Sequence, residues 1–131
     1  MRFVLALHTD DGVGYGVTVP DLPGCFSAGD TFDEAVQNAY EAIDLHVETM
    51  IEDGAPLPLP KAISEHQQDE LLADAVWVVI DAPVEKYMGP AEKINITVPA
   101  LLLKHIDTYA STHGESRSGF LVRAARQAMA A

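Results

Sequence analysis

The stretch VPDLPGCFSAGDTFDEAVQNAYEAI, residues 19–43, decides how the N-terminal half of this chain folds. Pro20 and Pro23 have no backbone N–H to donate, so they cannot lie inside a central strand and must bend the chain. Gly24 allows a reversal, and the five residues that follow it, 25–29, predict a short third strand of a meander. The stretch is therefore a corner of the scaffold, and none of its residues indicates reaction chemistry.

A helix is predicted to start directly after this corner. Thr31 and Glu34 have the spacing of a capping box, in which the threonine hydroxyl accepts a hydrogen bond from the first turn. Apolar residues then recur every three or four positions as far as Met50, which predicts one buried helix face, and Gly54 ends the helix. The opposite face is acidic and carries Glu34, Glu41, Glu48 and Glu52.

Further strands complete an α+β domain. Residues 3–8 and 12–19 alternate in the manner of strands, and residues 64–74 predict a short polar helix. Residues 75–80, AVWVVI, are apolar at every position, which predicts a strand that is covered on both faces. The predicted order is β-β-β-α-β, and we assign residues 1–82 to this N-terminal domain.

A second, smaller domain is predicted to follow a linker. Residues 83–91, PVEKYMGPA, hold two prolines and a glycine at a change of composition, which is typical of a linker. Within residues 92–131, the segment 93–98 alternates as a strand, and helices are predicted over 99–113 and 116–129. A β-α-α unit of this size has too little apolar surface to be stable alone. We therefore expect two chains to share a two-stranded ribbon.

The 131 residues carry a formal net charge of −12, and this charge is unevenly divided. Residues 1–90 hold 17 acidic and three basic residues, a net of −14, whereas residues 91–131 hold five basic and three acidic residues, a net of +2. The acidic part repels nucleic acid and can attract a basic partner, while the C-terminal part can approach phosphates. Simple solubility remains the alternative explanation of the acidic surface.

Localisation is predicted from cysteine usage and from hydropathy. The single cysteine, Cys25, cannot form an internal disulfide, which agrees with a reducing compartment. The N-terminus lacks the long apolar core of a signal peptide, and no segment approaches the roughly 18 apolar residues of a membrane helix. We therefore expect a cytoplasmic protein with no membrane contact.

Both halves resemble known families. Residues 93–125, KINITVPALLLKHIDTYASTHGESRSGFLVRAA, resemble a ribbon-helix-helix DNA-binding domain, whose β-ribbon reads the major groove. Residues 19–43 resemble the HicB antitoxin family, whose N-terminal domain is a partial RNase H-like fold. HicB proteins commonly end in a ribbon-helix-helix or helix-turn-helix module, so the pairing of domains supports both resemblances.

The resemblance implies a function. A HicB relative neutralises a HicA toxin, a small mRNA-cleaving protein, and represses its own operon at operator DNA. The N-terminal domain would cover the toxin, and the C-terminal ribbon would form a homodimer, or a tetramer of two such dimers. No cofactor is implied. A stand-alone ribbon-helix-helix regulator of transcription is the first alternative.

Three polar residues of the predicted ribbon, Lys93, Asn95 and Thr97, point away from its apolar face. Lysine can donate to guanine, asparagine can bridge adenine, and threonine can contact a base edge or the thymine methyl group. Two-fold pairing would place both copies of this triplet on one ribbon, which favours base readout. The alternative is that they form the solvated face of an edge strand.

Phosphate contact is predicted at the start of the second helix of the C-terminal domain, where Ser116, Arg117 and Ser118 combine backbone N–H groups with a positive charge. Many capped helix starts bind no phosphate, so an ordinary cap is the alternative. For the toxin, the resemblance points to the acidic helix face and its Glu34, Glu41 and Glu48. Solvation is the alternative for any one of these glutamates.

A metal-dependent, RNase H-like nuclease is the second alternative function. Such an enzyme needs several carboxylates around two metal ions about 4 Å apart, and Asp10, Glu48 and Asp81 are the candidates. Asp10 lies beyond the end of its strand, and the inward-facing residues of that strand offer no ligand. No histidine belongs to a short metal-ligand motif. We therefore expect no catalytic residue and no metal site.

Overall fold

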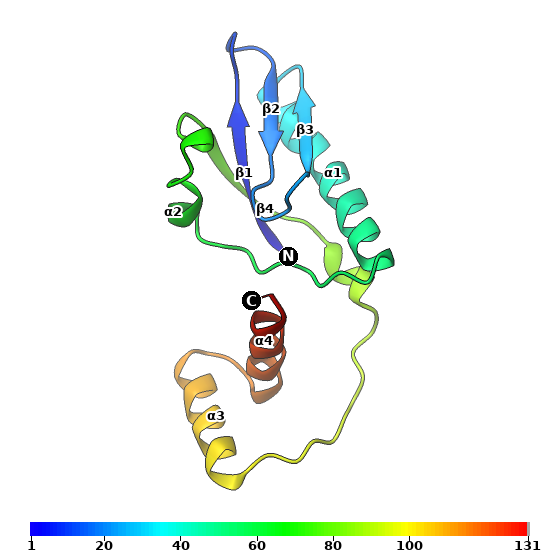
Figure 1. Ribbon diagram of the computed structural model, residues 1–131, viewed down its shortest axis with the longest axis vertical. Coiled ribbons are helices and arrows are strands. Elements are labelled where there is room, and N and C mark those ends of the chain that lie inside the picture. The colour runs from blue at the N-terminus through cyan, green and yellow to red at the C-terminus, as the bar shows by residue number, and fades with distance from the viewer. Residues whose placement is uncertain (131) are drawn as a thin grey trace. The chain divides into compact units, whose positions relative to one another are not determined.

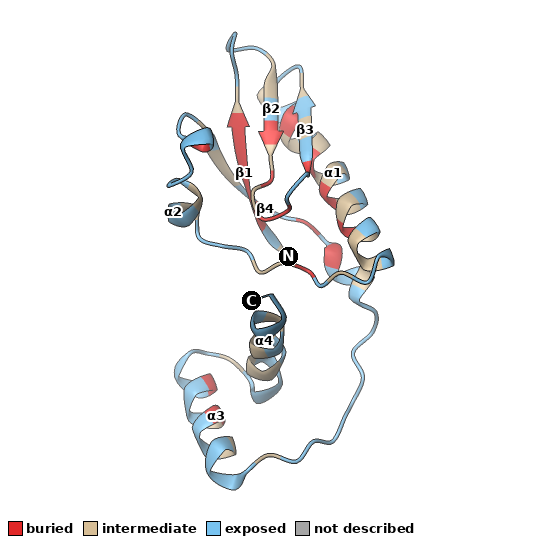
Figure 2. Ribbon diagram, in the orientation of Figure 1, coloured by how far each residue is buried: buried red, intermediate tan, exposed pale blue. Residues whose placement is uncertain are grey.

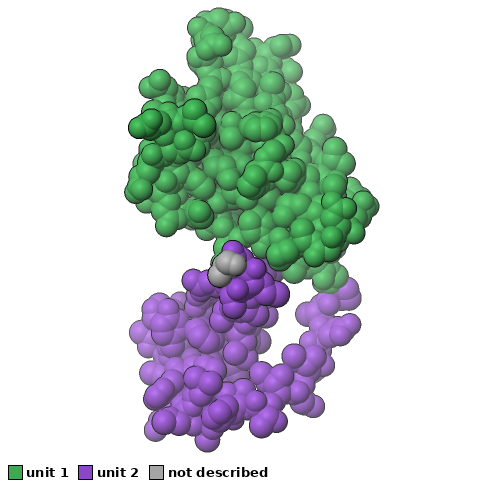
Figure 3. All heavy atoms as spheres, in the orientation of Figure 1, with its two compact units in different colours: residues 1–89 green, residues 90–131 purple. Residues whose placement is uncertain are grey.

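The computed structural model describes residues 1–130. Two compact units divide the chain: the front unit is Met1–Gly89, and the second unit, here called the tail, begins at Pro90 (Figure 3). Each unit has its own helices, and the larger apolar core belongs to the front unit. Among the described residues, no helix combines the length and apolar character that crossing a bilayer requires.

The front unit is a four-stranded antiparallel sheet with one long helix against it (Figure 1). The strands lie in the order β3-β2-β1-β4, so β3 and β4 are the two edges. Their bounds are β1 Arg2–His8, β2 Tyr15–Thr18, β3 Phe26–Gly29 and β4 Val76–Asp81, and the helix is α1, Phe32–Glu52. The predicted α+β class and the β-β-β-α-β order are confirmed.

The core lies between the sheet and the inner face of α1, and Figure 2 shows β1 and that side of the helix as buried. Phe3, Leu5 and Leu7 of β1 are fully buried there, on one side of the strand as the alternation predicts. The helix contributes buried side chains at helical spacing: Ala35, Ala39, Ile43 and Val47. The predicted cap is confirmed, because the Thr31 hydroxyl accepts from the Glu34 N–H at 3.1 Å.

The corner between β2 and α1 is held by its own backbone. The Val19 N–H donates to the carbonyl of Cys25 at 3.1 Å, which closes the loop. Gly24 has a φ of +85°, a left-handed value that a side chain disfavours. A Cβ on Gly29 would lie 2.7 Å from the Cα of Ala35, so the last residue of β3 must be glycine for α1 to start so close.

A buried carboxylate ties this corner to the connection that follows α1. Asp21 is 6% exposed, and its Oδ1 accepts from the Lys61 N–H at 3.0 Å. The same oxygen lies 2.9 Å from Nε2 of His66, whose ring stacks on Trp77. Asp21 therefore fastens the corner to a segment about 40 residues away along the chain, a role that the sequence pattern did not reveal.

The expected polar helix over residues 64–74 is split in two. It consists of α2, Ile63–His66, and a single 3-10 turn, η1, Glu70–Leu72. Asp69 lies between them, and its carboxylate accepts from the Leu71 N–H at 3.0 Å. This local bond starts a new turn and so prevents a continuous helix.

The expectation that the last strand is covered on both faces is wrong. Val76 and Val79 of β4 are 49% and 43% exposed. Apolar residues at every position are typical of strands inside a parallel sheet, whereas β4 is an antiparallel edge strand. One of its faces packs on the core through Ile80, and the other face is only partly covered.

Most of the predicted linker, residues 83–91, packs on the front unit. It contains a 3-10 helix, η2, Val84–Met88, and Val84 is completely buried in the core. Tyr87 donates its hydroxyl to Asp44 of α1 at 2.9 Å. The front unit therefore runs to Gly89 rather than to Ala82, because Val84 and Tyr87 anchor a segment that its prolines and glycine had marked as a linker.

The tail holds two helices after an extended segment. They are α3, Ala100–Thr112, and α4, Arg117–Ala130, close to the predicted bounds. Ser116 is the predicted cap of α4, and its hydroxyl accepts from the Gly119 N–H at 3.0 Å. Residues 93–98 form no strand in the single chain. A ribbon needs a neighbouring strand, which we expected from a second chain, so the ribbon stays a prediction.

Candidate binding surfaces

The extended start of the tail is almost wholly exposed, and Figure 2 shows it as a pale segment leading to α3. Lys93, Asn95 and Thr97 are all exposed there. Ile94 and Ile96, which alternate with them, are 75% and 58% exposed. Full burial of such a side chain stabilises a protein by roughly 1.5–3 kcal/mol. In a strand this alternation would give one apolar and one polar face, whereas in the single chain both sets of side chains are exposed.

Ser116, Arg117 and Ser118 lie at the start of α4, close to where the sequence predicts this helix to begin. The structure adds a carboxylate beside them: Nε and Nη2 of Arg117 each donate to an oxygen of Asp107, both at 2.8 Å. The hydrogen bonds from Arg117 lower the pKa of Asp107, and the same bonds raise the pKa of Arg117. Arg117 is therefore held in one orientation with much of its charge offset, a pairing across ten positions that no sequence motif indicated.

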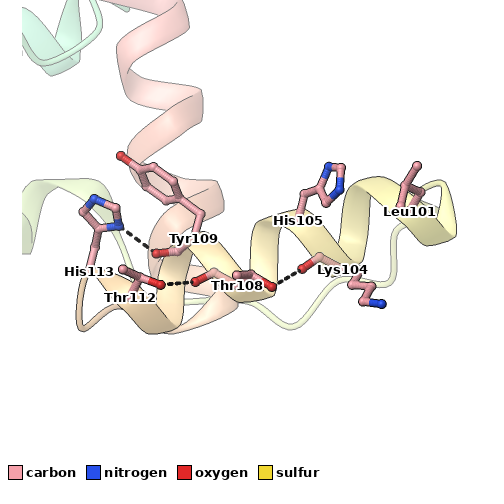
Figure 4. Close-up of a pocket in the computed structure, with 7 residues that line it drawn as sticks. All are labelled: Leu101, Lys104, His105, Thr108, Tyr109, Thr112 and His113. Carbon is pink, nitrogen blue, oxygen red and sulfur yellow. Dashed lines mark hydrogen bonds between the residues drawn. The ribbon is translucent and has the colours of Figure 1, made fainter.

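The exposed side of α3 forms a shallow hollow, which Figure 4 shows from the side. The hydroxyls of Thr108 and Thr112 donate to backbone carbonyls one turn earlier, so they are not aimed at a ligand. The ring of His113 stacks on Tyr109 with centroids 4.0 Å apart, and Leu101 lies at the other end. The hollow is a mixed apolar and basic helix face without a nucleophile and its base.

The acidic face of α1 presents Glu34 and Glu41 to solvent, while Glu48 is half-buried. These glutamates lie seven residues apart, so they form one stripe along the helix. Beside Glu48, the segment η2 brings a positive charge against α1, because Lys86 Nζ lies 2.9 Å from Oδ1 of Asp44. Hydrogen bonds from Lys86 and Tyr87 lower the pKa of Asp44. The stripe is therefore most acidic toward the start of the helix.

Another hollow, on the front unit, lies between the corner and the second half of α1. Gly24, Cys25 and Phe26 line one side, and Leu45 and His46 belong to the other. Burial raises the pKa of the Cys25 thiol, which is 3% exposed. Sequence reasoning missed this hollow because its two sides are about 20 residues apart.

The three carboxylates of the nuclease alternative do not come together. Asp81 lies opposite Arg2 at the start of β1, and Asp10 lies beyond His8 at its other end. Seven strand residues span more than about 20 Å, whereas carboxylates that hold two metal ions about 4 Å apart must lie together. In residues 1–130, no three acidic, histidine or cysteine side chains are close enough to share an ion. The geometry therefore does not provide the cluster that the nuclease alternative requires.

Comparison with known proteins identifies one family over nearly the whole chain. The family model described as HicB_like antitoxin of bacterial toxin-antitoxin systems matches residues 3–125. A protein of Haemophilus phage HP1, described as an uncharacterized 14.9 kDa protein of the rep-hol intergenic region, is 52% identical over 110 residues. That match covers 82% of this chain and 83% of the phage protein.

Solved structures of antitoxins are similar as well. The crystal structure of antitoxin HicB3 is 31% identical, with 98% of both chains covered and a TM-score of 0.85. A chain of the structure described as a HicA3 and HicB3 toxin-antitoxin complex is also similar: the match is 29% identical, covers 63% of this chain and 98% of that one, and has a TM-score of 0.54.

Proposed function

The chain belongs to the HicB-like antitoxin family, and on that premise we propose that it neutralises a HicA-type toxin and represses its own operon by binding operator DNA. An antitoxin acts by binding, so its role is not enzymatic. The front unit is proposed to hold the toxin, and the tail is proposed to hold the DNA. The match over residues 3–125 carries the proposal, because it spans both units.

The charge of the front unit supports a basic protein as its partner. Three basic residues stand against 17 acidic ones within residues 1–89, and a field of this sign attracts a cationic protein while it repels nucleic acid. A similar chain belongs to the solved structure of a HicA3 and HicB3 toxin-antitoxin complex. We propose the stripe of Glu34, Glu41 and Glu48 as part of the contact, on a unit that we assign to the partial RNase H-like fold.

The tail is proposed to be a ribbon-helix-helix unit that two chains complete. Its exposed Ile94 and Ile96 support this. If two such segments paired side by side as a ribbon, the helices of the two tails could cover its apolar face and bury both side chains. Leu102 and Val122 are further exposed apolar side chains, and they lie on the two helices of the same unit. Lys93, Asn95 and Thr97 would then face the bases from both strands of one ribbon.

Ser116, Arg117 and Ser118 are proposed to contact the DNA backbone. The start of a helix attracts phosphate through its N–H groups and its dipole. The Gly119 N–H already bonds to Ser116, so the N–H groups of Arg117 and Ser118 remain the natural donors. Asp107 would keep the guanidinium of Arg117 beside them.

DNA binding is tested by the triple variant Lys93→Ala, Asn95→Ala and Thr97→Ala. We expect specific binding to the DNA upstream of its own gene to be lost in a gel-shift assay. The midpoint temperature of thermal unfolding should be unchanged, because all three side chains are exposed. Lys104→Ala on α3 is the control, since it removes an exposed positive charge outside the ribbon. An unchanged footprint from the triple variant would refute base readout by this segment.

Toxin binding is tested by reversing charge on the stripe. Glu34→Lys combined with Glu41→Lys should weaken capture of the co-encoded toxin in a pull-down and abolish rescue of growth. The control, Glu65→Lys combined with Glu70→Lys, makes the same change of net charge at other exposed positions. Equal loss in both variants would mean that only net charge matters, and full binding by the stripe variant would show that the toxin binds elsewhere.

A further inference from the structure

The hollow beside the second half of α1 has mostly apolar walls, and Figure 1 shows β3 lying next to this helix. Its volume is about 450 Å³. We call it the front-unit hollow and define it by its apolar lining: Cys25 and Phe26 on the corner side, and Ala42, Leu45 and Met50 on the helix side. Among the described residues, no lysine or arginine lines it.

Two large apolar side chains of this hollow are exposed. Leu45 is 66% exposed on the helix wall, and Phe26 is 65% exposed on the wall formed by β3. Leu45 is the one apolar side chain among the exposed residues of α1, the others being Asp33, Glu34, Gln37, Glu41, Thr49 and Glu52. Scattered exposed apolar residues are ordinary, whereas two that line one hollow form the kind of patch that marks an interaction site.

The polar groups of the hollow do not form a site for a small polar molecule. The Thr49 hydroxyl donates to the carbonyl of Leu45 at 2.9 Å, so it is already occupied. Asp53 is exposed at the end of α1. His46 is then the one remaining polar side chain of the lining, whereas a small-molecule site needs a few convergent polar groups. The hollow therefore suits an apolar side chain of a protein partner.

Carboxylates form the rim of the hollow. Glu41 lies four residues before Leu45 and Glu48 lies three residues after it, so both are its neighbours on the helix surface. Asp53 adds a further carboxylate at the end of the helix. The acidic stripe of α1 therefore borders the apolar hollow directly, and one partner can contact both.

We propose that the front-unit hollow receives an apolar side chain of the toxin, flanked on the toxin by lysine or arginine residues that meet the acidic stripe. This inference rests on the proposed function and adds the anchor that the stripe lacks. Binding energy in protein interfaces concentrates in a few side chains that fill pockets. Charges at the rim act mainly on the rate of association. The stripe would therefore steer the toxin, and the hollow would hold it.

The charge of the front unit favours this occupant over others. The unit has 17 acidic and three basic residues, a net of −14. A second copy seated on the hollow would bring two acidic rims together, and nucleic acid or an anionic lipid surface would be repelled in the same way. A cationic protein with an apolar side chain between its basic residues complements both the rim and the walls.

The test measures the binding kinetics of the full chain on the purified toxin that is encoded beside it. Leu45→Gln leaves the net charge unchanged but makes the side chain polar. We expect its dissociation rate to rise about tenfold or more, with the association rate and its salt dependence unchanged. The matched control is Leu71→Gln, the same substitution at a leucine of η1 that is 86% exposed. It should bind like the unchanged chain.

Two further variants test the chemistry of the anchor. Leu45→Met keeps a flexible apolar side chain and should retain slow dissociation. Phe26→Thr truncates the opposite wall with a residue that suits a strand, and it should also speed dissociation. Because both walls would hold the same toxin side chain, the loss in the double variant Leu45→Gln and Phe26→Thr should be smaller than the product of the two single losses. Urea midpoints should be unchanged, since both side chains are exposed.

Unchanged dissociation of Leu45→Gln would overturn the anchor, and so would an equal loss for Leu71→Gln or for Leu45→Met. Slower association with unchanged dissociation would assign Leu45 to steering and refute its role as an anchor. A lower assembly mass of Leu45→Gln in sedimentation equilibrium would show that the hollow holds a second copy instead. If the unchanged chain does not bind the toxin, the proposed function and this inference fall together, whereas toxin binding that is indifferent to Leu45 removes this inference alone.

Discussion

Val84→Ala tests whether the segment after β4 is part of the front unit. Val84 is 0% exposed and packs in the same core as Phe3 and Ile43. Each buried methyl group that is lost costs about 0.8 kcal/mol of transfer free energy, so two cost about 1.6 kcal/mol. The remaining cavity adds to this loss. We therefore expect the free energy of unfolding of the front unit to fall by about 2 kcal/mol.

Urea unfolding followed by tryptophan fluorescence measures this loss in the intact chain. The single tryptophan of the sequence, Trp77, lies in β4, so its emission reports on the front unit. With a denaturant slope of about 1 kcal/mol per molar for a unit of this size, the midpoint should fall by about 2 M. Met88→Ala is the matched control, since Met88 belongs to the same segment but is 47% exposed. Exposed substitutions usually change stability by about 0.5 kcal/mol or less.

Equal midpoints for the two variants would refute the assignment. Residues 83–89 would then behave as a linker, and a fragment that ends at Ala82 would be as stable as one that ends at Gly89. If the expected difference is found, a functional front fragment must include η2.

Three further predictions concern packing, pH and salt. Gly29→Ala should lower the stability of the front unit by about 1–3 kcal/mol through overlap with the first turn of α1, and a wild-type urea midpoint would contradict this. The hydrogen bond from Lys86 holds the pKa of Asp44 below its ordinary value, so its stabilisation is complete above about pH 4 and lost as the pH falls through the lowered pKa. Urea midpoints of Asp44→Asn and wild type should therefore differ at pH 7 and converge in acid, and a constant difference would argue against the pair. Arg117→Ala should reduce the slope of log affinity for operator DNA against log salt by about 1, and an unchanged slope would remove Arg117 from the phosphate contacts.

Local patterns of the sequence predicted most elements of this fold. The helix α1 was found from its cap at Thr31 and its apolar period, and the tail helices were found from Pro99, Gly114 and Ser116. These signals work because a helix start, a helix end and an amphipathic face depend on residues within about four positions of each other. The same locality explains why the corner of residues 19–31 could be described correctly before the structure.

Contacts between distant residues lay beyond those patterns. Asp21 meets His66 and Arg117 meets Asp107, and neither spacing follows a helical or strand period. For the candidate sites, the sequence placed Ser116–Ser118 at a helix start but could not show the carboxylate that holds Arg117. It also could not show that Lys86 offsets the acidic stripe of α1 near Asp44.

By itself, then, the sequence determined the α+β class, the order of the elements, the acidic front and the weakly basic tail. The tertiary structure alone decided where each element lies in the sheet. An apolar run such as residues 76–80 has the same pattern at the centre of a sheet and at its edge, because hydropathy records the preference for burial and not the neighbour that provides it. Val84 was misassigned for the related reason that prolines and glycine beside it describe the local backbone, whereas its burial depends on a helix 40 residues earlier.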